Sequence, residues 1–280
     1  MRLLLASALL LWVPTRVAAT ERGTHDLVIV GLDYAFQTPA RVPAGPTTIH
    51  FVNKGKVAHE LNIVLLKRGV TMQQFAAASN AGQPLAPLLE ATVGVVFAEP
   101  GTRATARIAV DLLPNREYAL RCIFKDSASA PRHFTLGMYG SILVDSASTR
   151  PSSPMRADTI VGMDYAFRAP ARLAPGRHRL AFVNAGKQRH ELSVALLKRG
   201  VSVQQLMRDD AAGKSVDDSI EAGLGVLHTP GESSPMGLLE VDLLPGREYL
   251  ILCNFSDTPS SPMHFKLGMF GGITVSERAR

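Results

Sequence analysis

YALRCIFKDSASAPRHFTLGM occupies residues 118–138, and YLILCNFSDTPSSPMHFKLGM occupies residues 249–269. Both stretches begin with Tyr, reach a Cys four residues later and end with His, Gly and Met at the same spacing. They belong to longer copies, because residues 26–145 recur as residues 157–276 at a nearly constant offset of 131. Two copies of one pattern predict two similar folds in a single chain.

The repeat divides the chain into two predicted domains, residues 24–145 and residues 157–276. Between them, the Ser- and Pro-rich segment 146–156 has no apolar periodicity and is typical of a surface linker. With 280 residues, of which 46% are hydrophobic and 19% charged, the chain has a globular composition. It is long enough for each domain to bury a core of its own.

Short runs of β-branched and other apolar residues recur within each copy, separated by Pro-Gly and Asn-containing turns. Residues 27–31, 48–53 and 61–65 are examples of these predicted strands. Residues 71–74 form a predicted capping box that opens a helix, and residues 202–205 repeat this signature. The pattern predicts an all-β fold of two tandem β-sandwich domains, each with a mainly helical insertion.

Alternation along the strand before each cysteine predicts which side chains face inward. In the first copy Tyr118, Leu120 and Cys122 fall on one face, so the thiol should point into the sandwich. We expect Tyr118 to be a core residue at a corner of the sandwich. In the second copy Leu250 and Leu252 should face outward, where we expect them to cover a contact between the domains.

The first residues predict export. Arg2 and the apolar stretch 3–13 precede the small residues Val17-Ala18-Ala19, so we predict that residues 1–19 are a removed signal peptide and that the protein is periplasmic or secreted. No later stretch approaches the roughly 20 apolar residues of a membrane-spanning helix. We therefore do not expect an integral membrane protein.

A His and a Met follow each cysteine at fixed spacing, eleven and sixteen residues later, and a further His follows an Asn-x-Gly turn upstream. Two imidazoles and a thiolate in a trigonal plane, with a weak thioether above it, hold copper for electron transfer. The pattern therefore predicts two metal sites. The candidate ligands are His59, Cys122, His133 and Met138 in the first copy, and His190, Cys253, His264 and Met269 in the second.

These residues also have plainer interpretations. Two cysteines in an exported protein often form a disulfide, but a bridge here would need inward-facing positions of two domains to come within about 7 Å. Methionine is usually a core filler, and its spacing from His favours the ligand interpretation. The other four histidines have no His opposite them in the repeat. They are His25, His50, His178 and His228.

At these positions the sequence resembles the cupredoxin family of blue copper proteins. The resemblance covers nearly all of the predicted mature chain and implies Greek-key sandwiches, one type 1 copper per domain and electron transfer. Ten residues separate Cys from His, more than the two to four usual in small blue copper proteins. The matching residues are Asn53, Gly55, His59, Tyr118, Cys122, His133, Gly137 and Met138, then Asn184, Gly186, His190, Tyr249, Cys253, His264, Gly268 and Met269.

Three functions are compatible with this pattern. We predict an electron carrier and not an enzyme. The first alternative is a cupredoxin-like module for binding, scaffolding or copper storage without a redox role. The second is a two-domain copper oxidase or nitrite reductase, whose further copper needs a His beside the Cys and His-x-His pairs. Here Arg121 and Leu252 precede the cysteines, and no His-x-His occurs.

The charge of the chain bears on its partners. A formal net charge of +6 and a pI near 9.5 are compatible with a redox partner that has an acidic docking surface, but a plain solubilising surface is the interpretation that we favour. No basic run is interleaved with aromatic residues. The sequence therefore does not predict nucleic-acid binding.

Overall fold

The computed structural model describes residues 24–148, 155–229 and 235–276; the predicted signal peptide lies outside this part of the chain. The first copy forms β1 (His25–Leu32), β2 (Ala35–Gln37), β3 (Arg41–Asn53), β4 (His59–Leu66), α1 (Met72–Asn80), η1 (Ala86–Leu88), β5 (Leu89–Ala98), β6 (Arg107–Leu112), β7 (Glu117–Arg121), η2 (His133–Leu136) and β8 (Tyr139–Ser148).

The second copy repeats this order with one additional short strand. Its elements are β9 (Asp158–Met163), β10 (Ala166–Arg168), β11 (Arg172–Leu173), β12 (Gly176–Asn184), β13 (Glu191–Leu197), α2 (Val203–Ala211), η3 (Val216–Ser219), β14 (Ile220–His228), β15 (Leu238–Leu243), β16 (Glu248–Leu252), η4 (His264–Leu267) and β17 (Phe270–Val275). Strands therefore predominate strongly over helices in the described residues, which confirms the all-β class and the helical insertion in each copy.

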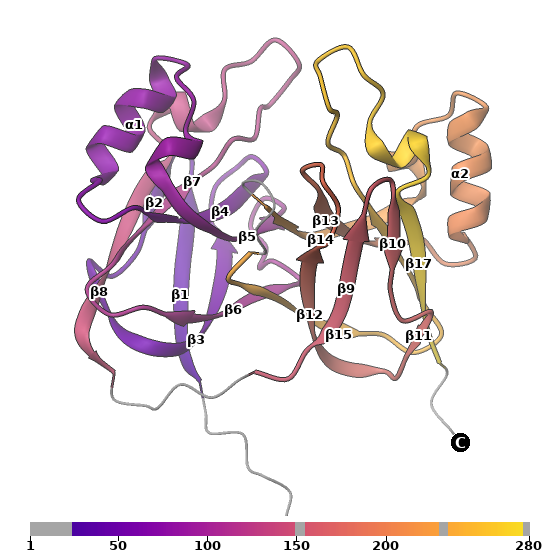
Figure 1. Ribbon diagram of the computed structural model, residues 1–280, viewed down its shortest axis with the longest axis horizontal. Helices are drawn as coiled ribbons and strands as arrows, with labels where there is room; N and C mark the ends of the chain where they lie inside the picture. Colours follow the sequence, from indigo (N-terminus) through magenta and orange to yellow (C-terminus); the bar gives the residue numbers. More distant parts are fainter. Residues whose placement is uncertain (1–23, 149–154, 230–234, 277–280) are drawn as a thin grey trace, which may run out of the picture.

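The strands pair in two series that both continue from one copy into the other. One series runs β2-β1-β3-β6-β15-β12-β9-β10, and the other runs β8-β7-β4-β5-β14-β13-β16-β17-β11. The start of β3 also pairs with β8, which links the series at one edge. The two copies lie side by side, with α1 and α2 at the same end of the molecule (Figure 1).

The apolar core lies between the two series of strands. Ile29 and Phe51 from one series and Leu61 and Ile63 from the other are all inaccessible to solvent, and they belong to one cluster. The same cluster continues into the second copy with Leu192 and its neighbours. Because successive residues of a strand face opposite sides of the sheet, the pairing fixes which side chains meet inside.

Ion pairs strengthen the junction between the copies. Arg107 on β6 contacts Glu240 and Asp242 on β15, with 2.8 Å between charged atoms in both pairs. Glu240 is almost completely buried and also accepts a hydrogen bond from Arg179 at 2.9 Å. A buried carboxylate needs such partners, because an unpaired charge there is strongly destabilising. The copies are therefore held together by backbone pairing, apolar contact and charge.

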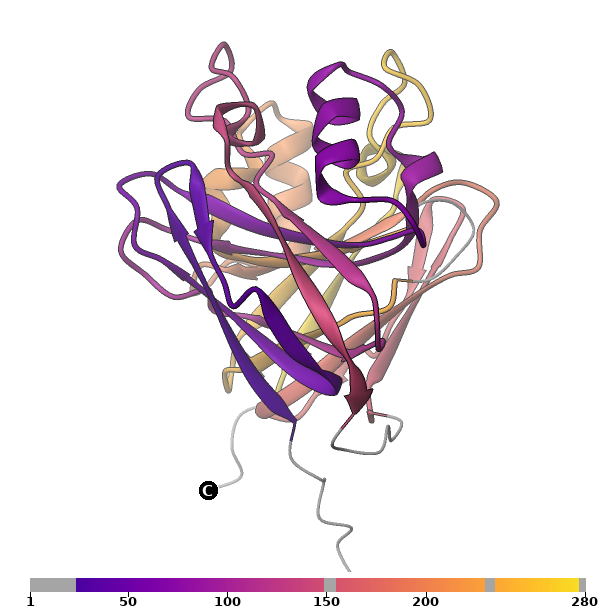
Figure 2. The ribbon, with the colours of Figure 1, turned by 90° about the vertical axis from the view of Figure 1, so that its left-hand side faces the viewer.

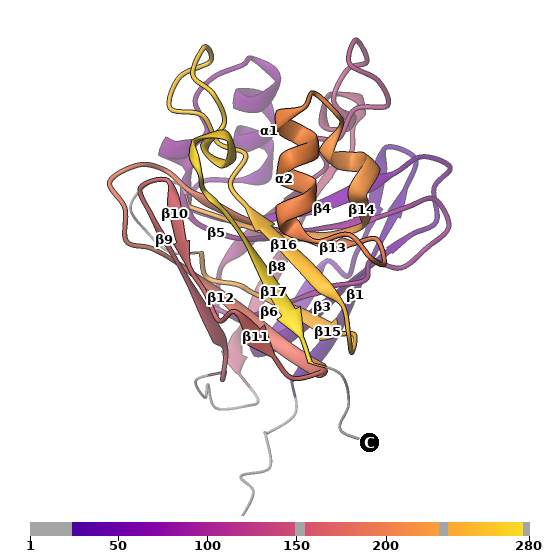
Figure 3. The same cartoon turned by 90° about the vertical axis from the view of Figure 1, so that its right-hand side faces the viewer.

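The helical insertions begin as predicted and cover the outer side of the second series. Thr71 accepts a hydrogen bond from the Gln74 backbone, and the Gln74 side chain accepts one from the Thr71 backbone, so the capping box of α1 is confirmed. Ser202 caps α2 through the backbone of Gln205. Figures 2 and 3 show each helix lying against its own copy.

One expectation about this outer side is wrong. Leu250 and Leu252 are buried, but they pack with Val203 and Leu206 of α2 and with Phe265, not at a contact between domains. The alternation of β16 does turn them away from the central core. The helix of the same copy already covers that face, so no second domain is needed there.

The corner tyrosines occupy the predicted interior positions. The Tyr118 hydroxyl accepts a hydrogen bond from the Leu113 backbone at 3.0 Å, and the Tyr249 hydroxyl accepts one from Leu244 at 2.9 Å. Strand β8 extends to Ser148 and so includes the first three residues of the expected linker. Within the described residues, no helix has the length and apolar character to cross a membrane.

Candidate metal centres

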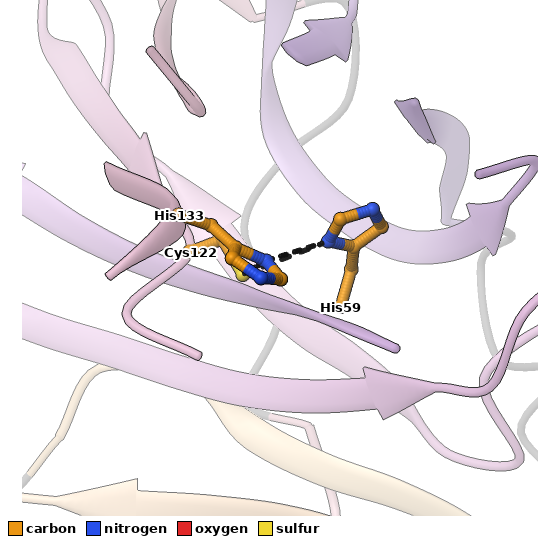
Figure 4. Close-up of side chains that lie close together, drawn as sticks. All are labelled: His59, Cys122 and His133. Carbon is orange, nitrogen blue, oxygen red and sulfur yellow. Dashed lines mark hydrogen bonds between the residues drawn. The ribbon is translucent and has the colours of Figure 1, made fainter. Parts of the chain in front are cut away.

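Three predicted ligands of the first copy meet in the interior. His59 opens β4, Cys122 follows the end of β7, and His133 opens η2. All three are buried, and the two rings point toward each other beside the thiol (Figure 4). The His59 and His133 Nδ1 atoms are 3.0 Å apart, and the Cys122 Sγ atom lies 3.5 Å from His133 Nδ1 and 4.0 Å from His59 Nδ1.

The second copy builds the same arrangement. His190 and His264 Nδ1 are 3.1 Å apart, and Cys253 Sγ lies 3.5 Å from His264 Nδ1 and 4.0 Å from His190 Nδ1. Within the described residues, these two groups are the only ones in which three or more His, Cys, Asp or Glu side chains could share a metal ion. The sequence repeat is therefore also a repeat of side-chain geometry.

These distances suit one ion per group. Protein metal–nitrogen bonds measure about 2.0 Å and metal–thiolate bonds about 2.3 Å, so one ion can join two nitrogens up to about 4 Å apart and a nitrogen and sulfur up to about 4.3 Å apart. All observed separations are within these limits. A donor set of two imidazoles and one thiolate fits copper.

Aspartates that contact the Nε2 atoms of the rings determine which ring nitrogen carries the proton. The His133 Nε2 atom lies 2.9 Å from Asp126, the His264 Nε2 atom 3.0 Å from Asp257 and the His190 Nε2 atom 3.3 Å from Asp164. A carboxylate accepts hydrogen bonds, so in these rings Nε2 carries the proton and Nδ1 keeps its lone pair for a metal. His59 Nε2 lies 3.5 Å from Asp33, too far for a hydrogen bond.

The Asn-x-Gly turn explains how the first histidine reaches the interior. The Asn53 side chain donates to the carbonyls of Val57 and Ala98 and accepts from the backbone of Gly55. A Cβ atom on Gly55 would lie only 2.8 Å from His59 Nε2 and 2.3 Å from Asp33 Oδ1. Only glycine leaves room for the ring there, so this motif positions the candidate ligand His59.

The predicted fourth ligands, Met138 and Met269, lie at the ends of the loops that follow the two cysteines, which we call the closing loops. Met138 is fully buried, and its backbone donates to the His133 carbonyl and accepts from the Cys122 backbone. Gly137 precedes it with a φ of 106°, a left-handed conformation that favours glycine. Met269 has the same backbone bonds and is also fully buried. The thioether as an axial ligand stays a prediction.

Burial sets the protonation of these groups. It raises the pKa of Cys122 to about 12 and that of Cys253 to about 11, and it lowers the pKa values of His59 and His190. Each sulfur accepts one backbone hydrogen bond at 3.4 Å, from Glu60 and Glu191 respectively. At neutral pH the thiols are therefore protonated, and a metal ion must displace that proton to bind.

The two cysteines form no disulfide, and three of the remaining histidines have surroundings of their own outside the two groups. Both thiols are free and buried in separate groups, so the structure contains no disulfide between them. His50 lies 2.7 Å from Asp26, and His178 lies 2.7 Å from Asp158. His228 lies at the junction, where burial, followed by Arg121 and Arg189, lowers its pKa to about 4.

Sequence reasoning missed the residues that surround the rings. Besides the aspartates, Tyr34 donates to Asp126 at 3.0 Å, and its ring meets the His133 ring edge to face with centroids 5.1 Å apart. Tyr165 repeats both contacts. Tyr34 has a φ of 64°, rare for a residue with a side chain. The repeat of Asp33-Tyr34 as Asp164-Tyr165 was the available signal.

Metal binding at neutral pH should release one proton from each cysteine. We expect Zn²⁺, which has no redox chemistry and accepts the same ligands, to release about two protons per molecule of metal-free protein at pH 7.5. A pH-stat titration measures the base consumed. The Cys122→Ser variant should release about one, and tight Zn²⁺ binding without proton release would contradict thiolate ligation.

Three comparisons with known proteins differ in what they find. A scan against models of protein families finds no match, and a search of curated proteins finds none either. Among solved structures, the chain is similar to auracyanin from Roseiflexus castenholzii (20% identity, TM-score 0.29, 44% of this chain and 98% of that one). It is also similar to auracyanin A, a "blue" copper protein of Chloroflexus aurantiacus (20% identity, TM-score 0.29, 44% and 100%).

A third solved structure spans both copies. It is the copper nitrite reductase from Nitrosomonas europaea, with 14% identity, a TM-score of 0.25 and coverage of 92% of this chain and 96% of that one. The similar structures thus include two that match 44% of this chain and one that matches 92% of it. At these TM-scores, the assignment of a metal centre rests on the chain's own residues.

Proposed function

We propose that the protein is an exported, cupredoxin-like electron carrier with one type 1 copper site in each copy. The observation that supports this most is the repeated buried group of two Nδ1 atoms and one Sγ atom, all within 4.0 Å of one another. The proposed ligands are His59, Cys122, His133 and Met138, then His190, Cys253, His264 and Met269.

The proposed domains, residues 24–145 and 157–276, are Greek-key sandwiches of the cupredoxin kind. In each, backbone bonds join the cysteine to the methionine of the closing loop, while one histidine comes from a separate strand. Copper held by such a set supplies one-electron redox chemistry. The protein contributes rigidity, because the four side chains are buried and tied to strands, so little has to move between oxidation states.

Burial favours a carrier over an enzyme. His59, His133 and Cys122 expose at most 1% of their surface, and the equivalent residues of the second copy are equally enclosed. A metal that binds and transforms a substrate keeps an open coordination position, and enclosure by protein opposes that. Electrons need no such opening. Storage or scaffolding is the alternative if copper binds without reversible reduction.

Location and partners follow from the sequence. We propose that residues 1–19 direct export to the periplasm or beyond, and that the excess of basic residues, with a formal net charge of +6, favours an acidic redox partner. Export also provides an oxidising compartment. In that setting, the buried thiols would be protected from disulfide formation by enclosure and by metal.

Replacing one cysteine should remove one site. We expect Cys122→Ser to eliminate about half of the intense visible absorption of copper-loaded protein, and Cys253→Ser to eliminate the rest, because that band requires a copper–thiolate bond. Absorption spectra during copper titration provide the measurement. Loss of all colour in either single variant would mean that both cysteines serve a single site.

Copper-loaded protein should exchange electrons without consuming substrate. We expect a redox mediator or small cytochrome to reduce and reoxidise it reversibly, with no enzyme-like consumption of oxygen or reduction of nitrite. Stopped-flow absorption and oxygen or nitrite assays measure the two properties. Turnover that is lost on replacing His50, His178 or His228, while both coloured sites stay filled, would support an enzyme instead.

A further inference from the structure

The two centres agree in ligand type, in the hydrogen bond to sulfur and in burial, and they differ slightly at the first histidine, where Nε2 lies 3.5 Å from Asp33 in one copy and 3.3 Å from Asp164 in the other. Corresponding distances within the two His–Cys–His groups differ by at most 0.1 Å, and each sulfur accepts one backbone hydrogen bond at 3.4 Å. Met138 and Met269 are both fully buried. Ligand type, hydrogen bonding to sulfur and burial therefore do not distinguish the sites.

The residue before each cysteine does distinguish them. Arg121 and Leu252 each directly precede a cysteine, so they have the same position relative to their centres. A row of residues that are directly opposite one another on neighbouring strands runs across both copies from Arg121 to Leu252. Its members, in order, are Arg121, Asn62, Val95, Val226, Ser193 and Leu252.

Arg121 brings a positive charge into a protein environment. It is partly buried, its guanidinium lies 5.7 Å from the centre of the Phe75 ring of α1, and its Nε atom is buried without a hydrogen-bond partner. Arginine keeps its charge at all relevant pH values. Leu252, by contrast, is 7% exposed and packs in an apolar cluster beneath α2.

Other charges near the two centres do not cancel this difference. Glu60 and Glu191 occupy equivalent buried positions beside the first histidine of each site. Lys125 and Arg132 near the first site are exposed, as are Arg189 and Lys266 near the second, so solvent and salt screen them. Of these charges, Arg121 is the one that has no equivalent in the other copy and is also partly buried, and the buried Glu60 near it is matched by Glu191.

From this asymmetry we infer that Arg121 makes the His59–Cys122–His133 centre the stronger electron acceptor, so that a half-reduced molecule holds its electron there. This rests on the proposed function. A nearby positive charge stabilises the reduced centre, which carries one positive charge less than the oxidised one. When one electron passes from the second centre to the first, the second is oxidised, the first is reduced, and no bond or proton changes.

The charge acts locally. Arg121 is the chain neighbour of Cys122, whereas Leu252 lies five strand spacings away along the row. At about 4.8 Å per spacing, this corresponds to about 24 Å. The Coulomb interaction falls with distance and is screened beyond about 10 Å where solvent intervenes. Arg121 should therefore affect the first centre much more than the second.

Redox titration of full-length, copper-loaded single-cysteine variants tests the inference. Cys253→Ser leaves the first centre as the source of the copper–thiolate band, and Cys122→Ser leaves the second. At one ambient potential we expect the ratio of reduced to oxidised copper to be at least about tenfold higher at the first centre, a shift of about 59 mV. This comparison leaves Arg121 unchanged and does not depend on how its variants fold.

Variants of Arg121 in the Cys253→Ser background test the cause. Arg121→Met, which keeps bulk and removes charge, should lower that ratio at least about tenfold, whereas Arg121→Lys should change it less than about threefold. An unchanged band position in both variants would show that copper geometry is retained. Equal effects of Met and Lys would overturn the charge explanation.

Two results separate this inference from the proposed function. Equal potentials at two coloured centres, or a higher potential at the second, would overturn the inference and leave the copper sites intact. Absence of the copper–thiolate band from both single-cysteine variants would overturn the proposed sites themselves, and the inference with them.

Discussion

The contact between a carboxylate and the outer nitrogen of an imidazole is the interaction on which both centres depend. Asp126 accepts from His133 at 2.9 Å, and Asp257 accepts from His264 at 3.0 Å. Because this contact holds the proton of His133 and of His264 on Nε2, Nδ1 of each of these rings keeps its lone pair for a metal. Each of these Nδ1 atoms lies about 3 Å from Nδ1 of the other histidine of its site, beside a thiol.

The strand framework makes that convergence possible. Each cysteine directly follows one strand and a histidine lies at or just before the start of the neighbouring strand, so backbone pairing between β4 and β7, or between β13 and β16, brings the side chains together. Glycine at 55 and at 186 leaves space that any side chain would fill. The shared core then fixes both copies in one body, with the two centres at equivalent places.

Much of this could be predicted from sequence, because the repeat makes coincidence improbable. Spacing alone brought His59, Cys122 and His133 together as a candidate group, and the structure places their donor atoms within 4.0 Å. Asp126 could not be assigned in the same way, since it comes from a loop whose fold is set by tertiary contacts. The error at Leu252 arose because alternation shows that a side chain faces outward, but not what covers it.

The contact between the two copies could not be predicted from the sequence pattern either. Pairing of β5 with β14 and of β6 with β15 depends on which edge strands remain open once each copy has folded. A repeat gives no indication of that choice, and Arg107 and Glu240, which form an ion pair across the junction, stand opposite Leu238 and Ala109 in the repeat.

The central claim is that each copy holds one copper between two Nδ1 atoms and one Sγ atom. Anomalous diffraction from crystals of copper-loaded protein, recorded on both sides of the copper absorption edge, tests it most directly. The account predicts two copper peaks, one per copy, each about 2.0–2.3 Å from the three donor atoms. A single peak, or copper at surface residues such as His50 or His178 with both buried groups empty, would contradict it.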